Sequence, residues 1–496
     1  MPIPPDVVKC FKYIDLQSKN FIEELRQIIK IPNVSSNPVA KGDLITMIYW
    51  MSNRLKQLGF QTQLKEPDYE KYKGNKPFII IASLGNCPKK KTLLYYCHLD
   101  VLKVYDSNWK NNPFEMIQMD GKLYGRGTAK MKGPLLCFIH AIESYVKVGI
   151  EVPVNIKIIC ESMNECRSKG LVSILNELKA TFLSKVDCVL LTDSHWLGKE
   201  YPCIIYGTRG VCYFNVIIEG PNRNLDSGNF GGIIYEPMQD LLNIINGLID
   251  SSGHINIPHF YDDVVRVTPE EEKIYEKIKV SVHEYKQNVG VNHFGHNEDM
   301  KTMLMHVWRH PWLNLHYIKS SCDDCSTLDI PSKIFCRFSI RIVPNQRYEI
   351  VSKLVIDYIH ELIKKLKTPN KIVLDIEKSS DPWYEDNQHW NYQAAIAATK
   401  QVYKEEVSLI REGNGFPILL NIRNALPKRN ILMLPIVSCE AKTHTEEENI
   451  SLRCYIEGTK LLASYLYELN VVSTQLSLSM KNPPKNICRN KLTDFK

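Results

Sequence analysis

Polar side chains with the chemistry of metal ligands follow four apolar stretches of the chain. In chain order they are His98 and Asp100 after residues 92–96, Asn164 and Glu165 after 154–159, Asp193 after 188–191, and His444 a short loop beyond 431–435. Imidazole nitrogen and carboxylate oxygen are the usual ligands of zinc and manganese. A single histidine after a strand is more often an ordinary hydrogen-bonded residue. The prediction of a metal site therefore depends on the coincidence of these positions.

The apolar stretches have the pattern of β-strands, and helical stretches separate them. Val154, Ile156 and Ile158 are β-branched at alternate positions, whereas 135–145 and 171–178 have the pattern of helices. The alternation of strand and helix predicts an α/β fold with a mostly parallel sheet covered by helices. Ligands bind beyond the carboxyl ends of the strands in such sheets. Asp100 is placed there to accept the second ring N–H of His98 and fix its tautomer.

The pattern changes near residue 210, where strands with polar and apolar alternation replace the α/β rhythm. A helix at 237–248, a strand at 333–343, a helix at 347–366 and a strand at 371–376 suit a smaller α+β domain with an antiparallel sheet. The rhythm resumes near residue 382. The sequence thus predicts a catalytic-type domain in two parts, 1–209 and 382–470, an inserted domain at 210–381, and a basic, disordered tail at 471–496.

Composition excludes several classes of protein. The net charge is +7, but the tail from Val471 contributes +4, so the body is not basic enough to predict nucleic-acid binding. There is no run of about eighteen apolar residues, and we expect no membrane span. Because no secretory signal precedes the scattered cysteines, we expect reduced thiols and a cytoplasmic location. The pair Cys322 and Cys325 is a lone C-x-x-C, which is weak evidence for zinc.

The sequence resembles the carnosinase and cytosolic non-specific dipeptidase family of two-metal peptidases from about residue 11 to 469. The motifs that carry the resemblance are CHLDV (97–101), DGKLYGRG (120–127), KGP (132–134), DSHWLGK (193–199), YGTRGVCYF (206–214), SGNFGG (227–232), FSIRIVPN (338–345), REG (411–413) and YIEGTKLLASYLYE (455–468). So many matches in one order imply the family's fold: a catalytic domain and an inserted lid domain that pairs two subunits.

The resemblance implies where the family's site residues fall. One ion would be held by His98 and Asp193 and the other by Glu165 and His444, with Asp100 behind His98. The lid arginine that binds the substrate carboxylate falls on Arg341. All of these positions keep the family's residue type, so the outer shell of a two-ion centre is retained in the sequence.

The residues at the centre differ from the family's. The bridging Asp falls on Lys130, the general-base Glu on Asn164, and the partner's carbonyl-polarising His on Asp226. In the substrate loop a family Ser falls on Gly415, and a family Thr on Leu328. A protonated lysine has no lone pair to offer a metal. We therefore expect the Lys130 ammonium to pair with Glu165 and Asp193; the alternative is that it turns to solvent and one ion binds.

The sequence predicts a homologue of metal-dependent dipeptidases that has lost catalysis and binds no metal, or at most one zinc or manganese ion. An alternative is a weak or altered single-metal hydrolase. A third is a protein whose function depends on its surface or tail. The resemblance implies a homodimer through the lid domain, with a heterodimer with an active relative as an alternative. A small peptide is the expected ligand of Arg341.

Overall fold

The computed structural model describes residues 3–37, 41–67, 78–105, 109–296, 299–322, 328–377 and 379–481. The chain forms two compact units. The first comprises Met1–Ile205, Asp386–Ser408 and Ile422–Lys496, and the second Tyr206–Glu385 and Leu409–Asn421. Residues 409–421, which the sequence assigned to the second catalytic-type segment, group with the second unit.

The first unit is built on a mixed sheet with a parallel centre. Its strands lie in the order β1 (Gln61–Lys65), β2 (Ile79–Leu84), β6 (Asn155–Glu161), β3 (Thr92–His98), β7 (Cys188–Leu191), β17 (Asn430–Met433) and β8 (Cys203–Thr208). Strands β6, β3, β7 and β17 run parallel, and the flanking pairs are antiparallel. Strands β15 (Trp383–Tyr384) and β16 (Ser408–Glu412) pair with β8 where the chain passes between the units. The predicted fold class is confirmed.

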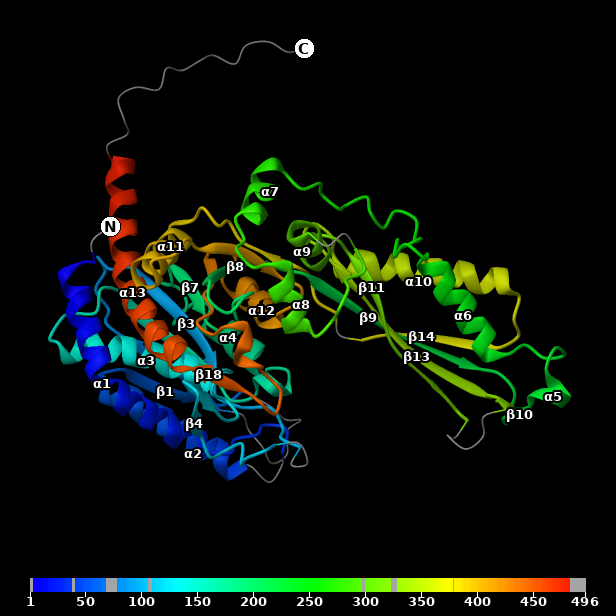
Figure 1. Ribbon diagram of the computed structural model, residues 1–496, viewed down its shortest axis with the longest axis horizontal. Coiled ribbons are helices and arrows are strands. Elements are labelled where there is room, and N and C mark those ends of the chain that lie inside the picture. The colour runs from blue at the N-terminus through cyan, green and yellow to red at the C-terminus, as the bar shows by residue number, and fades with distance from the viewer. Residues whose placement is uncertain are drawn as a thin grey trace, which may run out of the picture. The chain divides into compact units, whose positions relative to one another are not determined.

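Helices cover this sheet because their apolar positions recur at helical spacing. They are α1 (Pro5–Ile29), α2 (Lys41–Gln57), α3 (Lys132–Lys147), α4 (Leu171–Leu178), α11 (Trp390–Tyr403) and α13 (Leu452–Lys481). Helices α1, α3 and α13 pack against one another (Figure 1), and Phe138 on α3 stacks on Tyr95 of β3 with ring centroids 3.9 Å apart. Helix α12 (Pro417–Ala425) begins in the second unit and ends in the first.

Short elements complete the first unit. Strands β18 (Asn449–Ser451), β5 (Lys122–Tyr124) and β4 (Ile117–Met119) form a small antiparallel sheet. Two 3₁₀ turns, η2 (Asn164–Cys166) and η3 (Cys439–Ala441), lie in the loops that follow β6 and β17. The β18–β5 pairing joins segments that are more than 300 residues apart in the chain, and it brings the loop after β5 beside the segment before β18.

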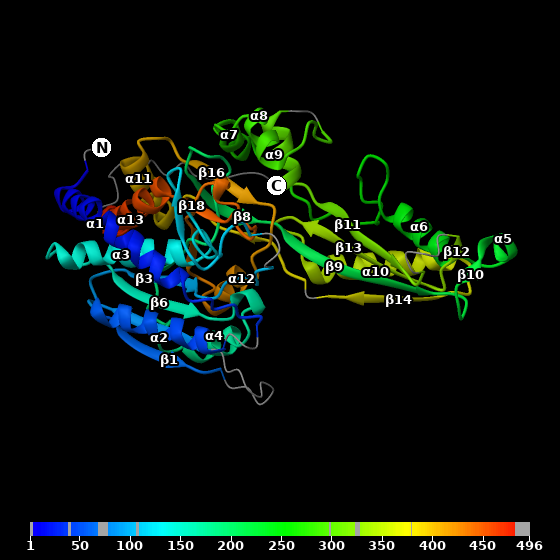
Figure 2. The ribbon, with the colours of Figure 1, turned by 60° about the horizontal axis from the view of Figure 1, so that its bottom comes forward.

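The second unit contains a four-stranded antiparallel sheet in the order β11 (Trp312–Ser320), β13 (Lys333–Ile342), β9 (Gly210–Glu219) and β14 (Lys371–Ile376). Helices α6 (Pro237–Leu248) and α10 (Tyr348–Leu366) pack on this sheet (Figure 2). Even-numbered residues of β9 and β13, such as Phe214 and Phe338, form the core between the sheet and these two helices. The remaining elements are β10 (Leu225–Asp226), α5 (Ser227–Phe230), α7 (Pro269–Glu276), α8 (Val282–Val289), α9 (Met300–Trp308) and β12 (Asp329–Ile330).

The last helix is longer than the sequence pattern predicted. Helix α13 continues to Lys481, although the prediction placed the beginning of a disordered tail at 471. No proline or glycine interrupts the chain between Gly458 and Pro483, so nothing in the backbone chemistry stops the helix earlier. Residues 482–496, which include most of the basic side chains of the predicted tail, lie outside the described residues.

Candidate metal centre

The carboxyl edge of the parallel strands carries the histidine and aspartate predicted as one ligand pair. Strand β3 ends at His98, and Asp193 follows β7 by two residues. The ring Nε2 of His98 lies 3.8 Å from Oδ2 of Asp193, and both side chains are buried. Within the described part of the chain, this Nε2 has no hydrogen-bond partner. The two residues meet because neighbouring parallel strands end at the same edge of a sheet.

Asp100 contacts the ring nitrogen of His98 that faces away from Asp193. The ring Nδ1 of His98 lies 3.1 Å from the main-chain carbonyl of Asp100 and 3.3 Å from its Oδ1. The carboxylate also accepts from Ser35 Oγ (2.6 Å) and from the backbone N–H groups of Asn164 and Glu165. Asp100 therefore fixes the ring of His98 and ties the 3₁₀ turn η2 to the end of β3.

Lys130, the residue that the sequence comparison assigned to the bridging position, forms an ion pair at this edge of the sheet. Its Nζ lies 3.3 Å from Oδ1 of Asp193. Burial lowers the pKa of Lys130, but the charges of Asp193 and Glu165 raise it more, so the pKa lies above its usual value. Burial raises the pKa of Asp193, but Lys130 and His98 lower it more, and the net shift is downward. Both partners are therefore held in their charged forms.

The second predicted pair, Glu165 and His444, lies within electrostatic range of the same cluster. Burial raises the pKa of Glu165, although His98 and Lys130 act in the opposite direction. His444 is exposed by surface area, but partial desolvation and the nearby Lys130 ammonium lower its pKa to about 4. His444 is therefore a neutral imidazole near pH 7. The ion pair of Lys130 is formed with Asp193, and Glu165 acts on the ammonium through its charge; the sequence had predicted that Lys130 would pair with both acids.

Asn164 belongs to a partly buried hydrogen-bond cluster that the sequence did not reveal. Its Nδ2 donates to Tyr96 Oη (3.0 Å), and the Tyr96 hydroxyl donates to Glu161. Ser168 Oγ donates to the same Glu161 oxygen at 2.8 Å. Burial is the main cause that raises the pKa of Glu161, to about 7. The Asn164 amide is therefore a hydrogen-bond donor in this cluster.

Glu448 is a second residue that sequence reasoning missed. Its side chain is 1% exposed and forms an ion pair with Arg126 at 2.8 Å. Its Oε1 also accepts from the backbone N–H groups of Gly127, Ala129 and Lys130 at 3.0–3.2 Å. In the sequence Glu448 is one of three consecutive glutamates, and nothing in that run shows which of them is buried.

The residues of this centre do not fit the pair of divalent ions that the family resemblance implies. The position that the resemblance assigns to the bridging ligand holds the Lys130 ammonium, which repels cations and offers no lone pair. Among the residues that the structure describes, no three His, Cys, Asp or Glu side chains are grouped so that they could hold a metal ion. The His98 and Asp193 pair retains the donor chemistry for a single ion, but one oxygen of Asp193 is already paired with Lys130.

The other predicted site residues lie in the second unit. Asp226 caps α5, because its Oδ1 accepts from the Asn229 backbone N–H at 2.8 Å. Arg341 lies on β13 opposite Val211. Burial of Arg209 is the main cause that lowers the pKa of Arg209 to about 10, and the positive charge of Arg341 lowers it further.

The substrate-loop positions Gly415 and Leu328 differ in their surroundings. A Cβ on Gly415 would lie 3.1 Å from the main-chain oxygen of Arg209, so this position has little room for a side chain. Leu328 is 74% exposed. The Sγ of Cys322 donates to the main-chain carbonyl of Asp329 at 3.7 Å, and Cys325, the second cysteine of the predicted C-x-x-C, lies outside the described residues.

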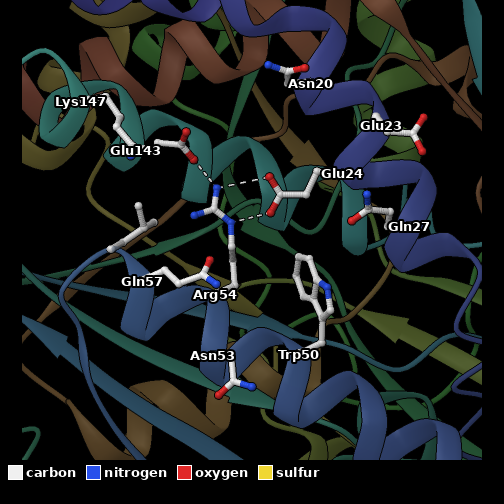
Figure 3. Close-up of a pocket in the computed structure, with 11 residues that line it drawn as sticks. Asn20, Glu23, Glu24, Gln27, Trp50, Asn53, Arg54, Gln57, Glu143 and Lys147 are labelled. Carbon is white, nitrogen blue, oxygen red and sulfur yellow. Dashed lines mark hydrogen bonds and ion pairs between the residues drawn. The ribbon is translucent and has the colours of Figure 1, made fainter.

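A cavity elsewhere in the first unit, of about 880 Å³, opens between α1, α2 and α3 (Figure 3). Arg54 crosses it and forms ion pairs with Glu24 (2.5 Å) and Glu143. The two carboxylates share one guanidinium, and the lining also includes Lys147, Asn53 and Gln57. In the described residues, no helix is both long and apolar enough to cross a membrane.

Comparisons with known proteins match nearly the whole chain. The model of peptidase family M20/M25/M40 matches residues 94–468. The chain is 34% identical to the Cys-Gly metallodipeptidase dug1 of Schizosaccharomyces pombe, over 94% of this chain and 98% of that protein. It is also 34% identical to the human Beta-Ala-His dipeptidase, over 94% of each chain.

Solved structures give the same result. The crystal structure of human carnosine dipeptidase 1 matches with a TM-score of 0.83 at 34% identity, over 95% of this chain and all of that one. The dipeptidase Dug1p of Saccharomyces cerevisiae matches with a TM-score of 0.81 at 31% identity, over 94% of this chain and 98% of that one. The chain therefore belongs to peptidase family M20/M25/M40, within its group of carnosinase and Cys-Gly metallodipeptidases.

Proposed function

We propose that this chain is a dipeptidase-family member that has lost peptide-bond hydrolysis and keeps the family's fold to bind a small peptide or another acidic ligand. The observation that carries the proposal is the ion pair between Lys130 and Asp193, 3.3 Å long, at the bridging position. Two divalent ions about 4 Å apart repel each other strongly, and a bridging carboxylate offsets that repulsion. An ammonium in its place adds to the repulsion.

Two further positions support the loss of catalysis. Asn164 cannot take a proton from water near neutral pH, and loss of a general base costs about a hundred- to ten-thousand-fold in rate. Asp226 places a negative charge where the family has a histidine that stabilises a developing negative charge, which costs roughly another hundred-fold or more. These effects need not add, but they all act on one mechanism.

Arg341 supports the binding part of the proposal. Guanidinium groups bind carboxylates through paired, charge-assisted hydrogen bonds. The retained arginine therefore suits a ligand that ends in a carboxylate, such as a dipeptide. We also propose that the chain forms a homodimer through its lid domain, or pairs with an active relative.

The test combines metal analysis with activity assays. Purified protein is incubated with zinc or manganese, freed of excess ion and measured by mass spectrometry for bound metal, and hydrolysis of Cys-Gly and carnosine is followed with each ion. We expect substoichiometric metal and no turnover above background. Stoichiometric metal together with turnover would overturn the proposal.

A single-metal hydrolase is the second candidate, and one observation favours it. His98 Nε2 is buried without a hydrogen-bond partner in the described residues, beside Oδ2 of Asp193. Those are the two atoms through which this pair would hold one ion, with zinc or manganese acting as a Lewis acid. One bound ion per chain with slow hydrolysis in the same assays would support this candidate.

A further inference from the structure

The loop that carries Lys130 is held by an unusual concentration of hydrogen bonds to one side chain. Glu448 Oε1 accepts from the backbone N–H groups of Gly127 (3.0 Å), Ala129 (3.2 Å) and Lys130 (3.0 Å). Its second oxygen, Oε2, accepts from Arg126 at 2.8 Å, and its main-chain carbonyl accepts from the N–H of Gly125. Glu448 and the loop are more than 300 residues apart in sequence, so these hydrogen bonds are tertiary contacts. We call this set of hydrogen bonds from Glu448 to residues 125–130 the clasp.

The same loop is fixed from its other end by Lys132. The Nζ of Lys132 is fully buried and donates to the main-chain carbonyls of Ile28 and Ile31, at 2.8 Å each, where α1 ends. The stem of Lys132 packs under Gly127, where a Cβ would lie 3.1 Å from Lys132 Cδ. The backbone of Lys130 thus lies between two anchors, Glu448 on one side and Lys132 on the other.

We infer that Glu448 is a positioning residue that holds the Lys130 ammonium against Asp193 and prevents it from turning to solvent. A lysine side chain has four rotatable bonds, and 19% of the Lys130 side chain is exposed. Without a fixed backbone, the ammonium has an open route away from the buried carboxylate. The inference rests on the proposed function in one respect, because the proposed function requires that the fixed Lys130 ammonium prevents two metal ions from binding.

The experiment measures how fast the Lys130 amine is acetylated by a brief pulse of acetic anhydride in the folded protein, read by mass spectrometry. Glu448→Gln weakens the charge-assisted bonds to the loop, and Glu448→Asp keeps the negative charge, which itself raises the pKa of Lys130, but is too short to span to the loop amides. We expect Lys130 to be acetylated about tenfold faster in both variants than in wild type. Lys132 is the internal control: it keeps its carbonyl partners and should stay unreactive. Glu447→Gln changes the neighbouring exposed glutamate, which pairs with Lys442, and should behave as wild type.

A Lys130 rate in folded Glu448→Gln that equals the wild-type rate would overturn the inference. Parallel acceleration of Lys132 would also overturn it, because it would show general loosening rather than loss of positioning. Acceleration in Glu448→Gln but not in Glu448→Asp would overturn it as well, because it would report the lost charge and not lost positioning. If Glu448→Gln fails to fold, Glu448→Asp alone decides.

Hydrogen exchange in the wild-type protein requires no variant. The amides of Gly127, Ala129 and Lys130 should be among the slowest to exchange in the first unit, and fast exchange would contradict the clasp. Stoichiometric metal and turnover in the wild-type protein would defeat the proposed function. The acetylation and exchange measurements would still report on Glu448 separately.

Discussion

The ammonium of Lys130 lies 3.3 Å from the carboxylate of Asp193, at the carboxyl edge of the parallel strands. The pair preserves local charge balance without a metal. Asp193 is 6% exposed, and an isolated carboxylate at that depth would cost several kcal/mol or take up a proton. The Lys130 ammonium thus stabilises the buried charge of Asp193, and the same positive charge disfavours the binding of two divalent ions.

Removing the Lys130 charge should destabilise the fold. In Lys130→Met the buried Asp193 loses its partner, and we expect a loss of about 2 kcal/mol in the free energy of unfolding. Urea denaturation in the presence of a chelator measures this loss. The control is Lys301→Met, because Lys301 forms an exposed ion pair with Glu272 that should be worth less than about 1 kcal/mol. Equal, small losses in both variants would contradict the structural role of Lys130.

Restoring the three central residues should restore the metal centre. We expect Lys130→Asp combined with Asn164→Glu and Asp226→His to bind zinc or manganese and to hydrolyse Cys-Gly at a measurable rate. The control carries Asn164→Glu and Asp226→His but keeps Lys130, and it should stay metal-poor because the ammonium remains. A triple variant that binds no metal would show that the surroundings of the centre have diverged as well.

Acid stability should depend on Glu24, which lines the cavity in Figure 3. Burial raises its pKa, but hydrogen bonds from His140 and Arg54 lower it more, to about 2 from 4.5. Because the folded pKa is the lower one, the stabilisation is present above about pH 4.5 and is lost as the pH falls toward 2; it amounts to about 3 kcal/mol.

The measurement is chemical denaturation of wild type and Glu24→Gln at pH 7 and at pH 3. The difference in unfolding free energy between them should shrink at the lower pH. The matched control is Glu23→Gln, one residue earlier on α1, where the glutamate is 55% exposed and makes a local pair with Arg26. The same pH dependence in both variants would argue against a specific contribution of the buried Glu24.

Binding of a carboxylate ligand should depend on Arg341. Calorimetric titration with Cys-Gly or carnosine should show binding to wild type that Arg341→Gln weakens about tenfold, the effect of losing a charge-assisted pair. Arg337→Gln is the matched control, since Arg337 lies on the same strand and is already paired with Glu377. Equal affinity in wild type and Arg341→Gln would remove Arg341 from the binding site.

The sequence by itself determined the strands and helices that position the site. The strand at 188–191 and the helices at 171–178 and 237–248 coincide with β7, α4 and α6, because the periodicity of apolar residues reflects which faces are buried. The meeting of His98 with Asp193 could also be foreseen, since parallel neighbours end at one edge. The assignment of Lys130 to the bridging position remains a prediction from the resemblance.

Only the tertiary structure decided how those residues are held and paired. From the sequence, the Lys130 ammonium could have paired with Glu165 or Asp193, or could have pointed to solvent; in the structure it pairs with Asp193. Its backbone lies in a loop whose N–H groups donate to Glu448, a residue more than 300 positions away in the chain. Asn164 donates into a cluster with Tyr96 and Glu161 that no local pattern reveals. Periodicity records burial along one element, whereas these contacts join side chains from separate elements. Charge pairing at a buried site is therefore decided by packing, after the fold has brought the elements together.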